Sequence, residues 1–220
     1  MSCMTRSEIA GYIDHTLLKS DAVDADYDRF CDQAKEYGFK AVCVNSSRVA
    51  YIKERLKGTQ IKVGSTVGFP LGVMDSQAKA FEASRAIAQG ADELDMVLNV
   101  GALKSGDLSL VEEDVRAVRD AASGGIVLKV IIETCLLTDE EKVTACKIVK
   151  SAGADFVKTS TGLAGGGATV DDIRLMRRTV GSDMGVKASG GIRDFATAER
   201  MIEAGANRIG AGDGVRIVTG

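Results

Sequence analysis

The sequence predicts an α/β fold, a single (β/α)8 TIM barrel with a short N-terminal helix. Eight short apolar runs of strand length alternate with stretches of helical pattern, as expected for parallel strands joined by helices. Glycines that end helices recur before every second run at a nearly regular spacing. An open, doubly wound sheet is the alternative, but eight units within 220 residues and no internal break favour the closed barrel.

The predicted strands are short apolar runs, and polar or glycine residues follow most of them. They cover residues 12–14, 41–44, 63–67, 94–97, 126–132, 156–158, 185–188 and 208–211. One of these runs carries a lysine in its middle, Lys129, and two others carry a lysine at or near the end, Lys158 and Lys187. A charged side chain within a buried strand needs an explanation, because burial of an unpaired charge is costly.

Capping boxes predict where several helices begin. In this motif a hydroxyl side chain and an acidic side chain three residues later each accept from the other residue's free backbone N–H. Three pairs fit the motif, and a fourth with aspartate as the acid is a weaker version. The pairs are Thr5 with Glu8, Ser109 with Glu112, Thr138 with Glu141, and Thr169 with Asp172. The first pair predicts the short N-terminal helix.

Four glycines, Gly38, Gly90, Gly153 and Gly205, are expected to end helices in the left-handed conformation. They precede the second, fourth, sixth and eighth strands and are 52, 63 and 52 residues apart. Each interval holds two units of strand and helix, roughly 26 to 32 residues per unit. The chain has one proline and no linker or low-complexity segment, so residues 1–220 are predicted to form one domain.

Composition excludes several functions. A net charge of −3 and a pI near 5.4 provide no basic surface, which argues against nucleic acid and anionic membranes as partners. No apolar run reaches the roughly 18 residues that span a bilayer, and the first residues turn polar at once, unlike a signal peptide. A cytoplasmic location is therefore expected.

Cysteine and histidine usage limits the possible chemistry. The five cysteines, Cys3 among them, form no C-x-x-C pair, so reduced thiols are expected and no zinc site is indicated. His15 is the one histidine, which argues against a His-rich metal site and against a Ser-His-Asp triad. His15 is expected to pack or hydrogen-bond beside Asp14. Acid and base chemistry is left to aspartate, glutamate and lysine.

Two lysines mark the candidate active site. The active site of a barrel lies at the carboxyl-terminal ends of its strands, where Lys158 and Lys187 end neighbouring strands. Two amines held close together disfavour each other's charge, so one should be neutral near pH 7, as a Schiff-base lysine requires. Asp95 could move the protons of such a reaction. The alternative is a structural network in which these lysines pair with Asp95 or Glu133.

Glycine-rich loops carry a second signal. Residues 189–194 and 210–214 follow the seventh and eighth strands, where barrels commonly hold a phosphate group on backbone N–H groups. The run 162–167 could supply further N–H donors or could be a mobile loop.

Seven motifs together resemble the deoxyribose-phosphate aldolases, a family of class I aldolases. They are IDHTLL (13–18), VGFPLG (67–72), ELDMV (93–97), LKVIIET (128–134), FVKTSTG (156–162), GGAT (166–169) and VKASGGIR (186–193). The resemblance implies reversible cleavage of 2-deoxy-D-ribose 5-phosphate to D-glyceraldehyde 3-phosphate and acetaldehyde, with no cofactor and no metal. It also implies a homodimer or homotetramer whose small-molecule partners are the phosphosugar and acetaldehyde.

The resemblance also assigns roles to matching residues. Lys158 would form the Schiff base, and Lys187 would lower its pKa. Asp95, with Lys187 and a water molecule, would move protons at the acetaldehyde methyl carbon, and Lys129 would keep Asp95 ionised and oriented. The other predicted site residues are substrate-binding Asp14, Thr16, Cys43 and Thr161, and phosphate-binding Gly162, Gly190, Gly191 and Gly212. For Cys43, an inert buried thiol is the alternative.

One departure from the family pattern concerns the phosphate. Gly212 and Asp213 stand where the family has two small hydroxyl or alanine residues. A carboxylate would repel a phosphate unless it points away or pairs, for instance with Arg193 or Arg216. Two alternative functions follow: an aldolase that prefers a less phosphorylated acceptor aldehyde, and a non-catalytic barrel that binds phosphosugars.

Overall fold

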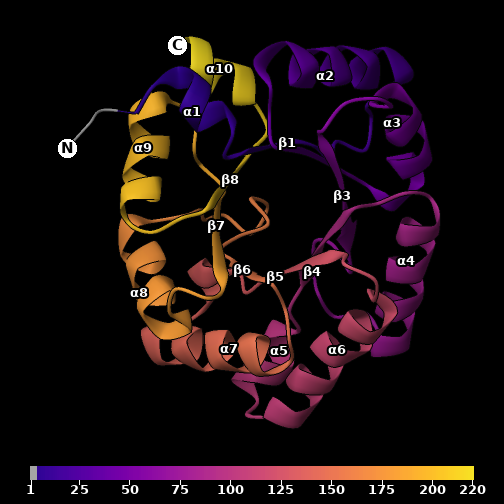
Figure 1. The fold of residues 1–220 in the computed structure, drawn as a ribbon. Coiled ribbons are helices and arrows are strands. Elements are labelled where there is room, and N and C mark those ends of the chain that lie inside the picture. Colours follow the sequence, from indigo (N-terminus) through magenta and orange to yellow (C-terminus); the bar gives the residue numbers. More distant parts are fainter. Residues whose placement is uncertain (1–3) are drawn as a thin grey trace.

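A closed parallel barrel forms the centre of the molecule, in a computed structural model that describes residues 4–220. The eight strands pair in chain order, and the last pairs with the first (Figure 1). They are β1 (Ile13–Leu17), β2 (Ala41–Val44), β3 (Lys62–Val67), β4 (Glu93–Val97), β5 (Val127–Ile131), β6 (Phe156–Lys158), β7 (Gly185–Ser189) and β8 (Arg208–Ala211). The predicted barrel is confirmed. The first strand runs three residues further than expected, to Leu17, and Cys3 lies outside the described residues.

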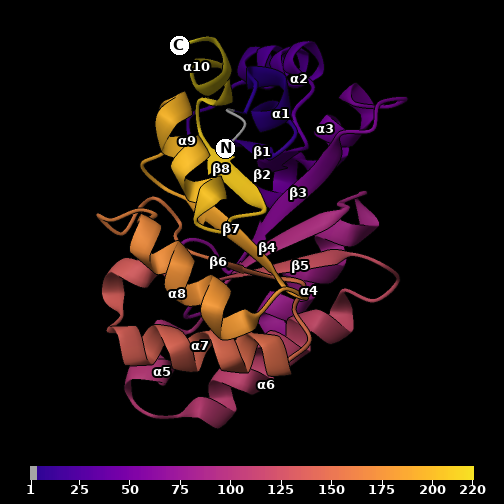
Figure 2. The ribbon, with the colours of Figure 1, turned by 60° about the vertical axis from the view of Figure 1, so that its left-hand side comes forward.

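Helices surround the barrel on all sides (Figures 1 and 2). They are α1 (Arg6–Ala10), α2 (Asp24–Tyr37), α3 (Val49–Arg55), α4 (Ser76–Ala88), α5 (Val100–Lys104), α6 (Leu108–Ala121), α7 (Asp139–Ser151), α8 (Val170–Val180), α9 (Phe195–Glu203) and α10 (Gly214–Thr219). Two 3₁₀ turns, η1 (Ser46–Arg48) and η2 (Thr134–Leu136), follow β2 and β5. The short α1 lies beside α10, where Arg6 donates hydrogen bonds to the carbonyls of Thr219 and Gly220.

Most predicted helix ends are confirmed. Thr5 and Thr138 each form the full capping box, and Thr169 caps α8 through its hydroxyl alone. The expected capping box of Ser109 with Glu112 is wrong, because Asp107 caps α6 by accepting from the N–H of Leu110. A carboxylate is an equally good cap and also interacts favourably with the positive end of the helix dipole.

The four glycines expected in left-handed conformation all have it. Their φ angles are 66° for Gly38, 103° for Gly90, 81° for Gly153 and 116° for Gly205. Each allows the chain to leave a helix and enter the next strand directly, which explains the short, regular repeat.

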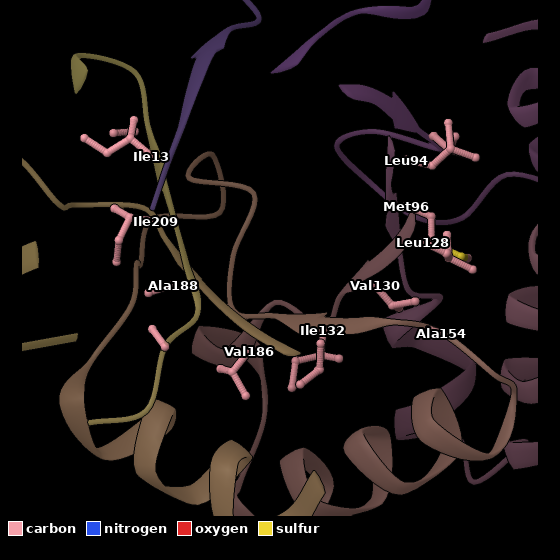
Figure 3. Close-up of a cluster of buried hydrophobic side chains, with 14 of the residues drawn as sticks. Ile13, Leu94, Met96, Leu128, Val130, Ile132, Ala154, Val186, Ala188 and Ile209 are labelled. Carbon is pink, nitrogen blue, oxygen red and sulfur yellow. The ribbon is translucent and has the colours of Figure 1, made fainter. Parts of the chain in front are cut away.

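Apolar side chains on the outer faces of the strands pack beneath the helices (Figure 3). Leu94 and Met96 of β4 and Leu128 and Val130 of β5 are fully buried in this layer. Successive side chains of a strand point to opposite faces. The charged residues between these apolar positions, such as Asp95 and Lys129, therefore point into the barrel.

Candidate active site

Strand register brings the predicted lysines and aspartate together inside the barrel. Asp95 of β4 is level with Lys129 of β5, and Lys158 of β6 is level with Lys187 of β7. A side chain at Gly210 of β8 would come within 3.2 Å of Cε of Lys187. The absence of a side chain there leaves room for Lys187 to extend across the barrel interior.

The carboxylate of Asp95 binds three amines at once. Its Oδ1 lies 2.8 Å from Nζ of Lys129. Its Oδ2 lies 2.6 Å from Nζ of Lys158 and 2.7 Å from Nζ of Lys187. The sequence-based prediction that these four residues meet is therefore confirmed in geometry, while their catalytic roles stay a prediction.

Three more buried charged residues extend this cluster below Asp95. Asp14 lies 2.5 Å from Lys187, and Arg208 bridges Asp14 at 2.7 Å and Glu93 at 2.6 Å. Glu93 also lies 2.6 Å from Lys129. The sequence analysis did not single out Glu93 or Arg208. Glu93 stands two positions before Asp95, so the period of two along the strand could have identified it.

Charge and burial shift the pKa values of these groups in different directions. For Asp95, burial opposes ionisation, but Lys129, Lys158 and Lys187 outweigh it and hold the pKa of the carboxyl well below its usual value. Asp14 behaves similarly, with Lys187 first among the cations that bring its pKa to about 2.

The two adjacent lysines respond in opposite ways. Burial lowers the pKa of Lys187, but Asp14 and Asp95 outweigh burial and raise it above its ordinary value. For Lys158, burial and the charge of Lys187 together outweigh Asp95, and the pKa of its amine is lowered. The expected asymmetry between the two amines is present. Burial lowers both pKa values, and the second carboxylate partner of Lys187, Asp14, separates them.

A cavity of about 350 Å³ opens above the cluster at the carboxyl-terminal ends of the strands. Among its lining residues are seven of the predicted site residues: Thr16, Lys158, Thr161, Gly162, Gly190, Gly191 and Gly212. Lys158 is the one amine of the Asp95 cluster in this lining. Exposed Lys19, which the sequence analysis did not consider, also lines the cavity.

Two predicted substrate contacts do not line this cavity. Asp14 is fully buried and occupied by Lys187 and Arg208, because its inward position on β1 lies one layer below the cavity floor. Cys43 is buried too, and burial followed by the charge of Asp95 raises the pKa of its thiol to about 11. The inert-thiol alternative therefore describes the environment of Cys43 better.

Four backbone N–H groups on one side of the cavity are available to bind an anion. Those of Gly162, Gly190, Gly191 and Gly212 donate to no acceptor within residues 4–220. Gly190 and Gly191 have φ angles of 85° and 78°, which glycine adopts without strain, and successive N–H groups in such a turn can bind an anion.

The loop at residues 162–167 is held in place. Ala168, next in the chain, donates its N–H to the carbonyls of Ser189 and Gly190 at 3.1 Å. A side chain at Gly167 would collide with the Gly190 carbonyl. Thr161 at the other end donates from its N–H and its hydroxyl to the buried Glu133. Both ends of this loop are therefore anchored by hydrogen bonds, which argues against the mobile-loop alternative.

Asp213 and His15 both contact the start of α10. The Asp213 carboxylate caps α10 by accepting from the N–H of Arg216 at 3.1 Å. Asp213 does not line the 350 Å³ cavity, but it lines a neighbouring one together with Gly190, Gly191 and Gly212. His15 stacks on Phe30 at 4.5 Å, and its Nδ1 accepts from the N–H of Gly214 at 3.3 Å. His15 thus holds the start of α10, and burial lowers its pKa.

Residues 4–220 contain neither a membrane-spanning helix nor a cluster of metal ligands. No helix there is long and apolar enough to cross a membrane. The described side chains also contain no group of three or more His, Cys, Asp or Glu residues placed to hold a metal ion.

These features define the class of protein: a (β/α)8-barrel enzyme whose buried lysines converge on one carboxylate beneath a cavity at the strand ends. The family follows from comparison with known proteins. A family model described as DeoC/LacD family aldolase matches residues 9–217, and the chain belongs to this family.

Individual relatives agree with this assignment. A deoxyribose-phosphate aldolase of Streptococcus pneumoniae is 61% identical over 209 residues, which cover 95% of this chain and 94% of the relative. A solved structure from Coccidioides immitis, with a provisional deoxyribose-phosphate aldolase assignment, is 43% identical at a TM-score of 0.95, covering 99% and 87%. The tetrameric deoxyribose phosphate aldolase of Aeropyrum pernix is 33% identical at a TM-score of 0.90, covering 97% and 91%.

Proposed function

We propose that this protein is a class I aldolase that reversibly cleaves 2-deoxy-D-ribose 5-phosphate to D-glyceraldehyde 3-phosphate and acetaldehyde. The observation that carries the proposal is the placement of Lys158. Its amine is buried, contacts the shared carboxylate of Asp95, and lies at the cavity floor. A buried amine of lowered pKa is the nucleophile that imine formation requires.

The reaction begins when the neutral amine of Lys158 attacks C1 of the open-chain sugar. The carbinolamine loses water to give a protonated imine. The proton of the C3 hydroxyl is then removed and the C2–C3 bond breaks, so its electrons form the enamine and glyceraldehyde 3-phosphate leaves. Protonation of the enamine at C2 and hydrolysis of the imine release acetaldehyde and restore the amine.

Asp95 and Lys187 supply the groups that move these protons. Both lie within 2.7 Å of one another and next to Lys158, so a water molecule bound between them and the substrate could carry protons to and from C2 and O3. Lys129 holds the other oxygen of Asp95 and keeps the carboxylate oriented. Lys187 stays protonated because Asp14 and Asp95 flank it.

The rest of the cavity fits the substrate's polar groups. The N–H groups of Gly162, Gly190, Gly191 and Gly212 are available for the phosphate. Lys19 adds a cation at the cavity wall. Thr16 and Thr161 also line the cavity and can contact the hydroxyls of the sugar.

A coupled assay tests this function. Purified protein and 2-deoxy-D-ribose 5-phosphate are incubated with a dehydrogenase that oxidises or reduces the released triose phosphate. Triose phosphate should form with wild type and be absent with Lys158→Met. A folded wild-type protein that releases no triose phosphate would refute the proposal.

The two alternative functions gain no support. The match to the aldolase family and to relatives named deoxyribose-phosphate aldolase favours catalysis over a non-catalytic barrel. A preference for less phosphorylated aldehydes was motivated by Asp213, whose carboxylate is used as a helix cap.

The proposal also includes an oligomeric state and a cellular location. We infer that the protein works as a homo-oligomer, a homodimer or homotetramer, which the tetramer of the Aeropyrum pernix relative supports. We also infer a cytoplasmic location, with which the absence of a spanning helix in residues 4–220 agrees.

A further inference from the structure

Six of the seven charged side chains inside the barrel form a closed ring. Each contacts two groups of opposite sign at 2.5 to 2.8 Å. The order around the ring is Asp95, Lys187, Asp14, Arg208, Glu93, Lys129 and back to Asp95. Lys158 is the seventh group, and it contacts Asp95 alone, at 2.6 Å.

The ring is balanced, and Lys158 is the surplus charge. Three cations face three carboxylates within the ring, so a protonated Lys158 would leave one uncompensated positive charge in a buried site. Burial of an uncompensated charge is costly, and a buried group avoids this cost by changing its protonation state. Lys158 has the fewest counter-charges, so it loses its proton most easily. The opposite pKa shifts of Lys158 and Lys187 agree with this reasoning.

We propose that Glu93 and Arg208 are positioning residues of the aldol reaction, because they close the ring that keeps Lys187 and Lys129 protonated and leaves Lys158 as the free amine. This inference rests on the proposed function, in which Lys158 forms the imine. Glu93 and Arg208 lie below the cavity and are absent from its lining, so they act through other residues.

The protonation of Lys158 depends on the charged and titratable groups that face it. Asp95 of β4 and Lys187 of β7 act on it directly, and Cys43 of β2 is a neutral thiol nearby. The remaining groups are Asp14 on β1, Glu93 on β4, Lys129 on β5 and Arg208 on β8, together with Lys19 in the cavity wall. Only the ring members change in the experiment below.

Removal of a ring cation and removal of a ring carboxylate should shift the pH profile of kcat/KM in opposite directions. Arg208→Met leaves an excess of carboxylate, so it should raise the pKa of Lys158 and shift the acid limb of kcat/KM upward by about one pH unit. Glu93→Gln leaves an excess of cation and should shift the limb downward by a similar amount. A purely structural role would lower activity in both variants without shifts of opposite sign.

Two further variants sharpen this result. Arg208→Lys keeps the charge, so its acid limb should stay within about 0.3 pH units of wild type. The double variant with Glu93→Gln and Arg208→Met loses one charge of each sign, so its limb should return towards the wild-type position. Shifts of the same sign in both single variants, or no shift in either, would overturn the proposal.

A measurement on the unaltered protein decides the question even if a variant does not fold. Lysine labelled with 13C at Cε reports the protonation of each amine by NMR, with Lys158 assigned as the signal lost in Lys158→Met. Lys158 should titrate at lower pH than Lys187 and Lys129. If Lys187 or Lys129 loses its proton first, the ring proposal is wrong. The coupled assay is independent of this result, so failure of the proposed function would be recognised separately.

Discussion

The protein contains two sites where a lysine is buried with a carboxylate, and they differ in their balance of charge. Lys79 of α4 lies 2.5 Å from Asp114 of α6, and its amine also donates to the carbonyls of Gly72 and Val97. This site has one cation, one anion and no access to the active-site cavity. Inside the barrel, Lys158 shares its single carboxylate partner with two other amines and reaches the cavity floor.

The difference shows what makes a buried lysine reactive. For Asp114, burial outweighs Lys79 and raises the pKa of the carboxyl, whereas three cations lower the pKa of the equally buried Asp95. Burial lowers the pKa of both lysines, so the two sites differ in their partners and in access to the cavity. Lys79 has a carboxylate and two carbonyls of its own, which tie it structurally between two helices. An incomplete set, together with an open cavity, makes Lys158 an amine that can react. Burial alone does not distinguish the two sites.

The largest expected effect is the loss of Lys158. Lys158→Met should reduce kcat/KM for retro-aldol cleavage by about 10⁴-fold or more, because Lys158 is the amine of the Asp95 cluster that lines the cavity. Stability should stay equal or rise by about 1 kcal/mol, since an apolar side chain replaces a buried amine that has only one counter-charge. Kinetics and urea unfolding on the same preparation measure both. Comparable activity in Lys158→Met would show that another group reacts.

Loss of Lys79 should have the opposite pattern. Lys79→Met leaves Asp114 buried without its partner, which should cost about 3 to 5 kcal/mol of unfolding free energy. The folded fraction should keep kcat within about threefold of wild type, because Lys79 lies outside the site. The double variant with Lys79→Met and Asp114→Leu is the matched control and should recover most of the lost stability. A Lys79→Met variant with wild-type stability but no activity would contradict the structural role of Lys79.

The barrel cluster also predicts how stability depends on pH. Asp14 has a pKa of about 2 in the folded protein against an ordinary value of 3.8. A carboxyl whose pKa is depressed by folding contributes stability above its unfolded pKa and loses it as pH falls through the folded pKa. This contribution, about 2 kcal/mol, should be present above pH 4 and disappear towards pH 2.

Urea unfolding between pH 5 and pH 2 measures this dependence. Asp14→Asn should flatten the slope between pH 4 and pH 2, whatever its effect at neutral pH. Asp183, an exposed residue away from the cluster, provides the control: Asp183→Asn should keep the wild-type slope. An unchanged slope in Asp14→Asn would mean that the ion pairs of Asp14 do not stabilise the fold.

The smallest expected effect concerns Asp213. Asp213→Ser should change stability by less than about 0.5 kcal/mol, because serine caps a helix about as well as aspartate, whereas Asp213→Ala should cost about 1 kcal/mol. Since the carboxylate of Asp213 caps α10, kcat/KM for the phosphosugar should change less than about threefold in Asp213→Ser. A tenfold gain would restore the view that this carboxylate repels the phosphate.

The sequence predicted the barrel well because its signals are local. Strand runs, left-handed glycines and most caps depend on neighbouring residues only. The error at Ser109 arose because two capping residues, Asp107 and Ser109, stood two positions apart and either could start the helix. Tertiary structure was not needed to predict where Lys158 and Lys187 end their strands.

The depth of each residue in the barrel could not be predicted from the sequence. The period of two along a strand gives the face of a residue but not its layer, so the sequence did not show that Asp14 is buried against Lys187. Arg208 begins its strand, and nothing in its neighbours indicates that it meets Glu93 across the barrel. Closure of the charge ring depends on register among five strands, which only the folded structure defines.

The most direct test of the central claim is to trap the reactive amine. Wild-type protein is treated with acetaldehyde and sodium borohydride, digested, and mapped by mass spectrometry. The ethyl adduct should appear on Lys158, while Lys79, Lys129 and Lys187 stay unmodified. An adduct on Lys187 or Lys129 with Lys158 intact would contradict the claim that Lys158 is the amine left without a second counter-charge.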